Sequence, residues 1–254
     1  MSNTLIVATH SYRGGTGKSN ITANLAYEAS KKGKIVGVVD SDLPSPGIHI
    51  LFGQDDPGTT LNGVLSKKYE LNDAIIDVTP NDINNPGKIF LLPGSPKPID
   101  IAKIIKDGFS LEQLIDIYRD FCHVKNLDLL FIDTHPGLNE STLLSITVSD
   151  LLIMLLRPDR QDYQGTAVTV DVSKKLCVPE MRFIVNKAIN SLDWNQLKMT
   201  IEKTYGEECI AVLPQSDEIM KYGGSGLFCN QEPDHDLTIA LRSVCESILK
   251  LQNT

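Results

Sequence analysis

Short apolar runs alternate with longer segments of helical periodicity along the chain. The runs are apolar throughout rather than at every second position, which is typical of strands covered on both faces of a sheet. They predict strands at 5–8, 35–39, 89–92, 129–132, 151–156, 181–185 and 209–213. Apolar residues three and four apart predict helices at 19–32, around 111–118 and at 236–251, and Gly33 ends the first of these.

The order of these elements predicts an α/β fold. Alternating strands and helices with right-handed crossovers give a doubly wound, mostly parallel sheet with helices on both faces. No repeat, low-complexity tract or linker-like change of composition interrupts the chain, and the polar segment 81–87 has the composition of a surface loop. We therefore expect a single domain over residues 1–254.

Composition narrows the class of protein. Hydrophobic residues make up 41% and charged residues 22% of the 254 residues, so we expect a folded chain rather than a disordered one. The net charge of −8 argues against a surface that is basic throughout and binds nucleic acid. The longest strongly apolar run, 151–156, is too short to span a bilayer, and the five cysteines include no CxxC pair. With no secretory signal in the sequence, we expect a cytoplasmic protein with reduced thiols.

A glycine-rich turn separates the first predicted strand from the first predicted helix. Residues 13–19 read Arg-Gly-Gly-Thr-Gly-Lys-Ser, and a strand, such a turn, Lys-Ser and a helix form the context of a phosphate-binding loop. Glycines let backbone N–H groups converge on phosphate oxygens, and the helix N-terminus adds partial positive charge. We expect Lys18 to reach the β- and γ-phosphates and the Ser19 hydroxyl to ligate Mg²⁺. The standard pattern has glycine at the position of Tyr12, so this loop is a variant.

The variant loop resembles the deviant Walker A motif, Lys-Gly-Gly-x-Gly-Lys-Ser/Thr, of the ParA/MinD family of P-loop ATPases. The resemblance extends over essentially the whole chain. Four further segments resemble family motifs and occur in the same order. Residues 38–42 resemble the second strand with its Asp-x-Asp ending, and residues 130–137 resemble the Walker B strand and the loop after it. Asn186-Lys187 resembles the pair that recognises adenine, and Leu213-Pro214 with Asp217 resembles the segment that closes over the base. Ordered motifs at the ends of predicted strands are more specific than a phosphate loop alone.

The resemblance implies roles for these residues. ATP would be held by Gly14, Gly15, Thr16, Gly17, Lys18, Ser19, Asn20, Asn186, Lys187, Pro214 and Asp217, and the catalytic set would be Lys18, Asp42, Asp40 and Arg13. Asp42 would orient the attacking water. Mg²⁺ would be held by Ser19, by Asp133 through water, and with support from Asp40. The strand pattern agrees, because residues i and i+2 share one side of a strand and ligands bind at the carboxyl edge of a doubly wound sheet.

Two positions depart from the family pattern. Arg13 stands where the family has its signature lysine, which reaches across a dimer to the partner's nucleotide. Arginine keeps the charge, but its planar fork is not interchangeable with an ammonium. Arg157 and Arg160 are alternative sources of such a cation, although we favour a solvated charged loop for both. Asn20 replaces a Ser or Thr that faces the α-phosphate, and it can still donate a hydrogen bond.

Two histidines are expected beside the nucleotide. His10 ends the segment before the phosphate loop, and His135 follows the Walker B-like strand. Either side chain has the chemistry to contact phosphate or water. We favour neutral, hydrogen-bonded loop histidines.

The resemblance implies an ATPase that turns over slowly with Mg²⁺ and acts as a switch. Two ATP-bound subunits would form a homodimer with the nucleotides sandwiched between them, and an activating adaptor protein would stimulate hydrolysis. The output would be the positioning or partitioning of a plasmid, chromosome, division component or microcompartment. Some carboxysome-positioning members also lack the signature lysine, so that branch is one candidate.

Other functions stay open at this point. One is a P-loop enzyme that uses ATP on a small molecule or a metallocluster, although the lack of CxxC argues against an iron–sulfur carrier. Another is a slowly hydrolysing regulatory dimer. The segment 241–251 has apolar spacing and only two basic residues, which predicts a core-packing helix and disfavours membrane binding. Nonspecific nucleoid DNA is the candidate matrix, because a few cations suffice for weak binding and a dimer doubles them.

Overall fold

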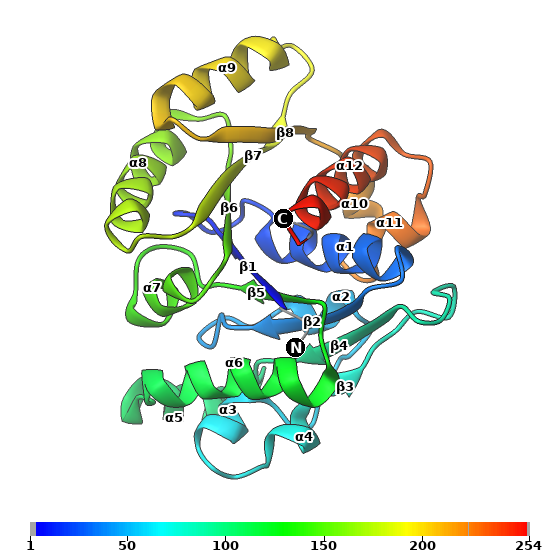
Figure 1. The fold of residues 1–254 in the computed structure, drawn as a ribbon, viewed down its shortest axis with the longest axis vertical. Coiled ribbons are helices and arrows are strands. Elements are labelled where there is room, and N and C mark those ends of the chain that lie inside the picture. The colour runs from blue at the N-terminus through cyan, green and yellow to red at the C-terminus, as the bar shows by residue number, and fades with distance from the viewer. Residues whose placement is uncertain (1–3, 223, 253–254) are drawn as a thin grey trace.

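In the part of the chain that is described, the strands form one eight-stranded sheet (Figure 1). The computed structural model describes residues 4–222 and 224–252. In spatial order the strands are β3 (Ile76–Asp77), β4 (Lys88–Leu92), β2 (Ile35–Asp40), β5 (Leu129–Asp133), β1 (Leu5–His10), β6 (Leu151–Leu156), β7 (Glu180–Ala188) and β8 (Glu208–Pro214). Neighbouring strands are parallel, except that β3 runs antiparallel to β4. All seven predicted strands are present. The sequence did not predict β3, because a strand of two residues is too short to show a hydrophobic pattern.

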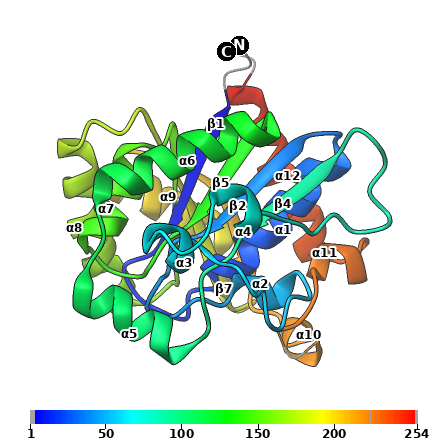
Figure 2. The same cartoon turned by 90° about the horizontal axis from the view of Figure 1, so that it is seen from below.

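Helices cover both faces of this sheet. One face carries α1 (Lys18–Lys31), α2 (Ile48–Leu51), α10 (Glu218–Lys221), α11 (Phe228–Gln231) and α12 (Asp236–Leu251). The other carries α3 (Leu61–Leu65), α4 (Leu71–Ala74), α5 (Pro98–Asp107), α6 (Leu111–Lys125), α7 (Glu140–Thr147), α8 (Arg160–Lys175) and α9 (Trp194–Tyr205). Figure 2, seen from below, shows α3, α4, α5 and α6 in front of the sheet. The predicted doubly wound α/β fold is confirmed.

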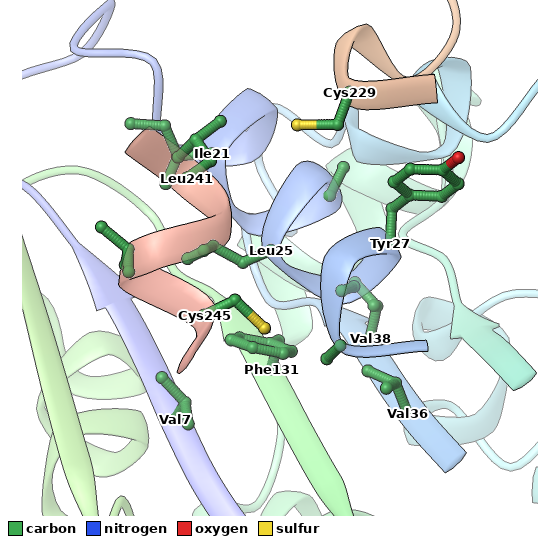
Figure 3. Packing of buried hydrophobic residues seen from close by; sticks show 14 of the residues in the cluster. Val7, Ile21, Leu25, Tyr27, Val36, Val38, Phe131, Cys229, Leu241 and Cys245 are labelled. Carbon is green, nitrogen blue, oxygen red and sulfur yellow. The ribbon is translucent and has the colours of Figure 1, made fainter. Parts of the chain in front are cut away.

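Neighbouring strand residues point to opposite faces, which explains why the strands are apolar throughout. Val38 of β2 and Phe131 of β5 are buried with Leu25 of α1 in one layer of the core (Figure 3). The next residue along each strand, Val39 and Ile132, is buried in the opposite layer with α6. A sheet covered on both sides has no solvent-facing position in its centre, so only its ends are left to carry polar chemistry.

The last helix, α12, packs against α1 as the apolar spacing predicts. Leu241 of α12 lies beside Ile21 of α1 (Figure 3). On the same pair of helices, Arg242 Nε donates to the buried Glu28 carboxylate at 3.1 Å. The prediction of a core-packing helix is confirmed. Within residues 4–222 and 224–252, no helix combines the length and apolar character needed to cross a membrane.

We expect Leu241→Ala to destabilise the protein by about 2–5 kcal/mol, because the leucine is buried and its truncation leaves a cavity between two helices. Ile239→Ala is the matched control. It lies on the exposed side of the same helix and is expected to change stability by less than about 0.5 kcal/mol. Urea unfolding followed by circular dichroism measures both, and equal losses would contradict this packing of α12.

Candidate nucleotide-binding site

Three central strands end at one edge of the sheet, and the predicted site residues follow those ends. The backbone register places Asp40 of β2 opposite Asp133 of β5, and Asp133 opposite Thr9 of β1. β1 then continues through residues 11–17 into α1. The register therefore brings two acidic residues beside the glycine-rich turn, although all three segments are far apart in the sequence.

The glycine-rich turn has the backbone that a phosphate loop requires. Gly15 and Gly17 have φ angles of 76° and 95°, in the left-handed region that favours glycine. Residues 14–20 line a cavity of about 450 Å³, together with Asp42, Ser45, His135 and Pro136. The N-terminus of α1 opens onto this cavity, so backbone donors and the Lys18 ammonium are gathered where a phosphate group would bind.

A second cavity, of about 340 Å³, adjoins the first. Gly17 and Asn20 line both cavities. The predicted base-side residues Asn186, Lys187, Pro214 and Asp217 all line the second one, with Ile21, Leu237 and Leu241 among its apolar walls. Every residue predicted to hold nucleotide therefore lines one of two adjoining cavities.

Two hydrogen bonds fasten the end of β7 to the phosphate loop. Asn186 Nδ2 donates to the Thr16 carbonyl at 2.7 Å, and Lys187 Nζ donates to the Gly15 carbonyl at 2.8 Å. A Cβ on Gly17 would lie 2.6 Å from Asn186 Nδ2. Glycine is therefore favoured at position 17 for two reasons: its positive φ angle and the close approach of the Asn186 side chain. The motif assigned Asn186 and Lys187 to the base. In the structure both side chains are bonded to the phosphate loop.

Asp40 is fully buried, and its carboxylate holds the turn after β2. Its oxygens accept hydrogen bonds from the backbone N–H groups of Asp42 at 3.2 Å, Gly47 at 3.0 Å and Ile48 at 3.4 Å. Burial, and then the nearby carboxylates of Asp133 and Asp42, raise the pKa of Asp40 well above its ordinary value. Asp40 lines neither cavity. In the structure, the hydrogen bonds that Asp40 accepts fix the turn that carries Asp42.

Asp133 is buried near Lys18 and Ser19. Burial raises the pKa of its carboxyl to about 6, with a further increase from Asp42, while the Lys18 charge and a hydrogen bond from Ser19 oppose the shift. Its Oδ1 has no hydrogen-bond partner among the described residues. A buried oxygen without a partner is unusual, so this atom marks a place where a cation or another donor would be stabilised.

The two histidines beside the site have different partners. His10 Nδ1 lies 2.8 Å from Thr134 Oγ1, and burial lowers the pKa of His10 to about 3. His10 is therefore the neutral, hydrogen-bonded histidine that we predicted. His135 Nδ1 lies 2.7 Å from Asp42 Oδ1. The sequence did not predict this contact, because the two residues belong to loops after different strands.

Arg13 lines neither cavity. One guanidinium nitrogen, Nη1, lies 3.6 Å from Asp162 Oδ1 and 3.7 Å from Asp159 Oδ1, at the start of α8. Arg157 pairs with the same Asp162 through Nε at 3.1 Å. Both arginines are therefore paired with acidic residues of their own subunit. Arg157 lies in a partly exposed charged loop, where the buried Asp162 carboxylate holds it, and Arg160 is exposed.

Tyr12, which replaces the first glycine of the standard motif, packs on α8. A Cβ added to Gly165 would lie 1.9 Å from the tyrosine ring, so the ring occupies the space that glycine leaves open. Nothing in the local sequence signals this pairing, because Tyr12 and Gly165 meet only through the fold. The contact joins the residue before Arg13 to α8.

Comparison with known proteins agrees with this geometry. A family model described as "ParA: NUBPL iron-transfer P-loop NTPase" matches residues 2–249. The chain belongs to this ParA family. The resemblance deduced from the motifs is confirmed, and membership implies that the protein binds and hydrolyses nucleotide.

Individual ParA-family relatives cover most of the chain. An uncharacterized ATP-binding protein of Methanocaldococcus jannaschii is 28% identical over 223 residues, which are 87% of this chain and 78% of that protein. The flagellum site-determining protein YlxH of Helicobacter pylori is 30% identical over 173 residues, 68% of this chain and 55% of that protein. The septum site-determining protein MinD of Pyrococcus horikoshii, solved with Mg-ADP, superposes with a TM-score of 0.82 at 24% identity, over 98% of this chain and 97% of that one. This last likeness shows a shared fold.

Magnesium fits the donors at the phosphate end of this ParA-family site. The described residues hold no group of three or more His, Cys, Asp or Glu side chains that could enclose a metal alone. Mg²⁺ needs no such cage, because it keeps several waters and binds through one or two carboxylates and substrate phosphates. The Ser19 hydroxyl and the unpartnered Asp133 Oδ1 are donors of this kind.

Asp133→Asn is expected to stabilise the nucleotide-free protein at alkaline pH. A pKa raised from 3.8 to about 6 means that the folded state binds more protons than the unfolded state between these values, so wild-type stability falls as pH rises through this window. The variant lacks this loss, and its melting temperature should exceed that of wild type by at least about 2 °C at pH 8. The difference should vanish near pH 4.

Differential scanning fluorimetry in EDTA measures this effect. Asp116→Asn, an exposed carboxylate on α6, is the control and should show no pH-dependent difference. A wild-type protein that melts above Asp133→Asn at pH 8 would contradict the electrostatic account of the site.

Proposed function

We propose that this ParA-family chain is an ATP-dependent dimerising switch that positions an intracellular cargo. The observation that supports it best is the pair of adjoining cavities, which share Gly17 and Asn20 at one edge of the sheet. The purine base would lie in the cavity walled by Asn186 and Pro214, and the triphosphate along residues 14–19. The ATP-binding relative from Methanocaldococcus jannaschii supports ATP as the nucleotide.

The residues around the phosphate cavity divide the chemistry among them. Lys18 and the N-terminus of α1 would neutralise the β- and γ-phosphates. Ser19 and Asp133 would hold Mg²⁺, which neutralises developing charge on the phosphates when bound. Asp42 lines the cavity and has one carboxylate oxygen engaged by Ser45 and His135, which leaves Oδ2 to accept a hydrogen bond from the attacking water.

Arg13 would connect hydrolysis to dimerisation. Its side chain is 39% exposed and bound to the acidic residues Asp159 and Asp162 of its own subunit, outside its own phosphate cavity. A second ATP-bound subunit that docks against this edge would offer a competing anion, the partner's triphosphate. The Arg13 guanidinium would then leave the carboxylates of its own subunit and bind the partner's triphosphate, and this would occur only in the ATP-bound dimer.

The biological output is inferred from the kind of relatives that the chain has. YlxH is described as flagellum site-determining and MinD as septum site-determining, and we extend a positioning role of this kind to this chain. An activating adaptor protein would stimulate hydrolysis and reset the switch, and nonspecific nucleoid DNA in the cytoplasm would be the matrix. Residues 1–254 would act as one domain.

Iron transfer, which the family description also mentions, is poorly supported by the cysteines of this chain. Four of them are buried, and burial raises their pKa values to about 11 for Cys122 and Cys209 and about 12 for Cys229 and Cys245. Thiolates bind iron–sulfur clusters, and these thiols are held protonated. Cys177 is exposed, but it lies between α8 and β7, at the sheet edge opposite the nucleotide.

The switch predicts a change of mass with nucleotide. Mg-ATP should bring the protein to about twice its mass of 27.9 kDa, while Mg-ADP should not. Asp42→Ala should retain the ATP-bound dimer because it keeps the phosphate loop, and Lys18→Ala should not form it. Light scattering after size exclusion measures all three proteins. A mass that ignores nucleotide in every one of them would overturn the switch and favour an enzyme whose ATP turnover depends on a metabolite.

Arg13→Ala should lower kcat for ATP by at least about 10-fold, as expected for loss of a cation that acts on phosphate in the transition state. ATP affinity should change by less than about 2-fold, because Arg13 lines neither cavity. Arg119→Ala, which removes an arginine from an exposed pair on α6, is the control. Turnover of Arg13→Ala equal to that of the control would rule out the proposed transfer.

A further inference from the structure

A histidine lies against the carboxylate that we propose to orient the attacking water. Nδ1 of His135 is 2.7 Å from Oδ1 of Asp42. A carboxylate oxygen accepts, so Nδ1 carries the hydrogen and donates it. Both side chains line the phosphate cavity, where Asp42 is 13% exposed and His135 is 30% exposed. The pair is therefore sheltered but reachable by substrate and water.

The same oxygen of Asp42 receives a second hydrogen bond. The backbone N–H of Ser45 lies 3.1 Å from Oδ1 and 3.0 Å from the Asp42 carbonyl, which closes the turn after β2. Two donors on Oδ1 restrict rotation of the carboxylate about its Cβ–Cγ bond. They also leave Oδ2 as the oxygen that can accept from a water.

The backbone that carries the imidazole is held in place independently of Asp42. Thr142 Oγ1 donates to the His135 carbonyl at 3.1 Å, and Pro136 restricts the backbone of the residue before it to extended conformations. On the other side, Thr134 donates to the Thr9 carbonyl through its N–H at 3.3 Å and its hydroxyl at 2.9 Å. His135 is thus presented to Asp42 by a loop anchored to both β1 and α7.

We propose that His135 is a positioning residue that fixes the Asp42 carboxylate so that Oδ2 faces the water that attacks the γ-phosphate. This inference rests on the proposed ATPase role of Asp42, and His135 acts through Asp42 rather than on the reacting atoms. Orientation matters because a displacement of about 1 Å in a reacting geometry can cost about 100-fold in rate. Loss of the imidazole should therefore lower kcat, while ATP binding, which uses residues 14–20 and the base cavity, should be retained.

Three substitutions of one residue separate positioning from packing. Asparagine places an amide nitrogen near the position of Nδ1, glutamine places one near the position of Nε2, and alanine removes the donor. His135→Ala and His135→Gln should lower kcat by about 10-fold. His135→Asn should stay within about 3-fold of wild type, and KM for ATP should change by less than about 2-fold in all three.

Phosphate release at high protein concentration gives kcat and KM, and binding of a fluorescent ATP analogue reports that each variant keeps its site. His123→Ala, an exposed histidine on α6, is the control with no expected effect. If Asp42→Ala abolishes turnover while His135→Ala matches or exceeds wild type, the positioning role is wrong and the proposed function stands. Equal losses in the alanine and asparagine variants would also overturn it. If Asp42→Ala hydrolyses ATP like wild type, the proposed role of Asp42 fails first.

Discussion

Burial of a cluster of carboxylates is the constraint on which the rest of this site depends. The register of β2 and β5 fixes Asp40 beside Asp133, and Asp42 follows two residues later. Burial raises the pKa values of Asp40 and Asp133, and nearby carboxylates add to it: Asp133 and Asp42 for Asp40, and Asp42 for Asp133. Buried carboxylates cost stability when they are ionised, and a cation bound beside them offsets that cost. The cluster therefore makes occupancy of the site a determinant of how stable the whole sheet edge is.

The loops around this cluster support one another rather than being fixed separately by the sheet. Asp40 binds the backbone of the turn that carries Asp42, and Asn186 binds the backbone of the phosphate loop. His135 then joins the turn after β2 to the loop after β5. The Asn186 and His135 connections each cross between segments that belong to different strands. The position of each of these loops is consequently tied to that of the segment to which it is bonded.

The sequence predicts those parts of this protein that depend on local pattern. Uninterrupted apolar runs locate the strands because both faces of the sheet are covered. Glycines locate the phosphate loop because the backbone angles at Gly15 and Gly17 favour glycine. Contacts between distant segments leave no such trace. Tyr12 on Gly165 and Arg13 on Asp162 arise from packing across the fold, and neither residue type alone specifies its partner. For the same reason the motifs placed Asp42 at the site but could not show what holds it.

The walls of the base cavity come from both ends of the sequence. Ile21 belongs to the first helix, whereas Leu237 and Leu241 belong to the last, and Leu241 packs in the same core layer as Ile21. During synthesis the phosphate loop leaves the ribosome long before α12 does. A nascent chain that lacks α12 therefore lacks part of the wall of the base cavity, so the complete nucleotide site forms only after the last helix has docked. The complete site is then open to nucleotide only in chains whose synthesis has passed α12.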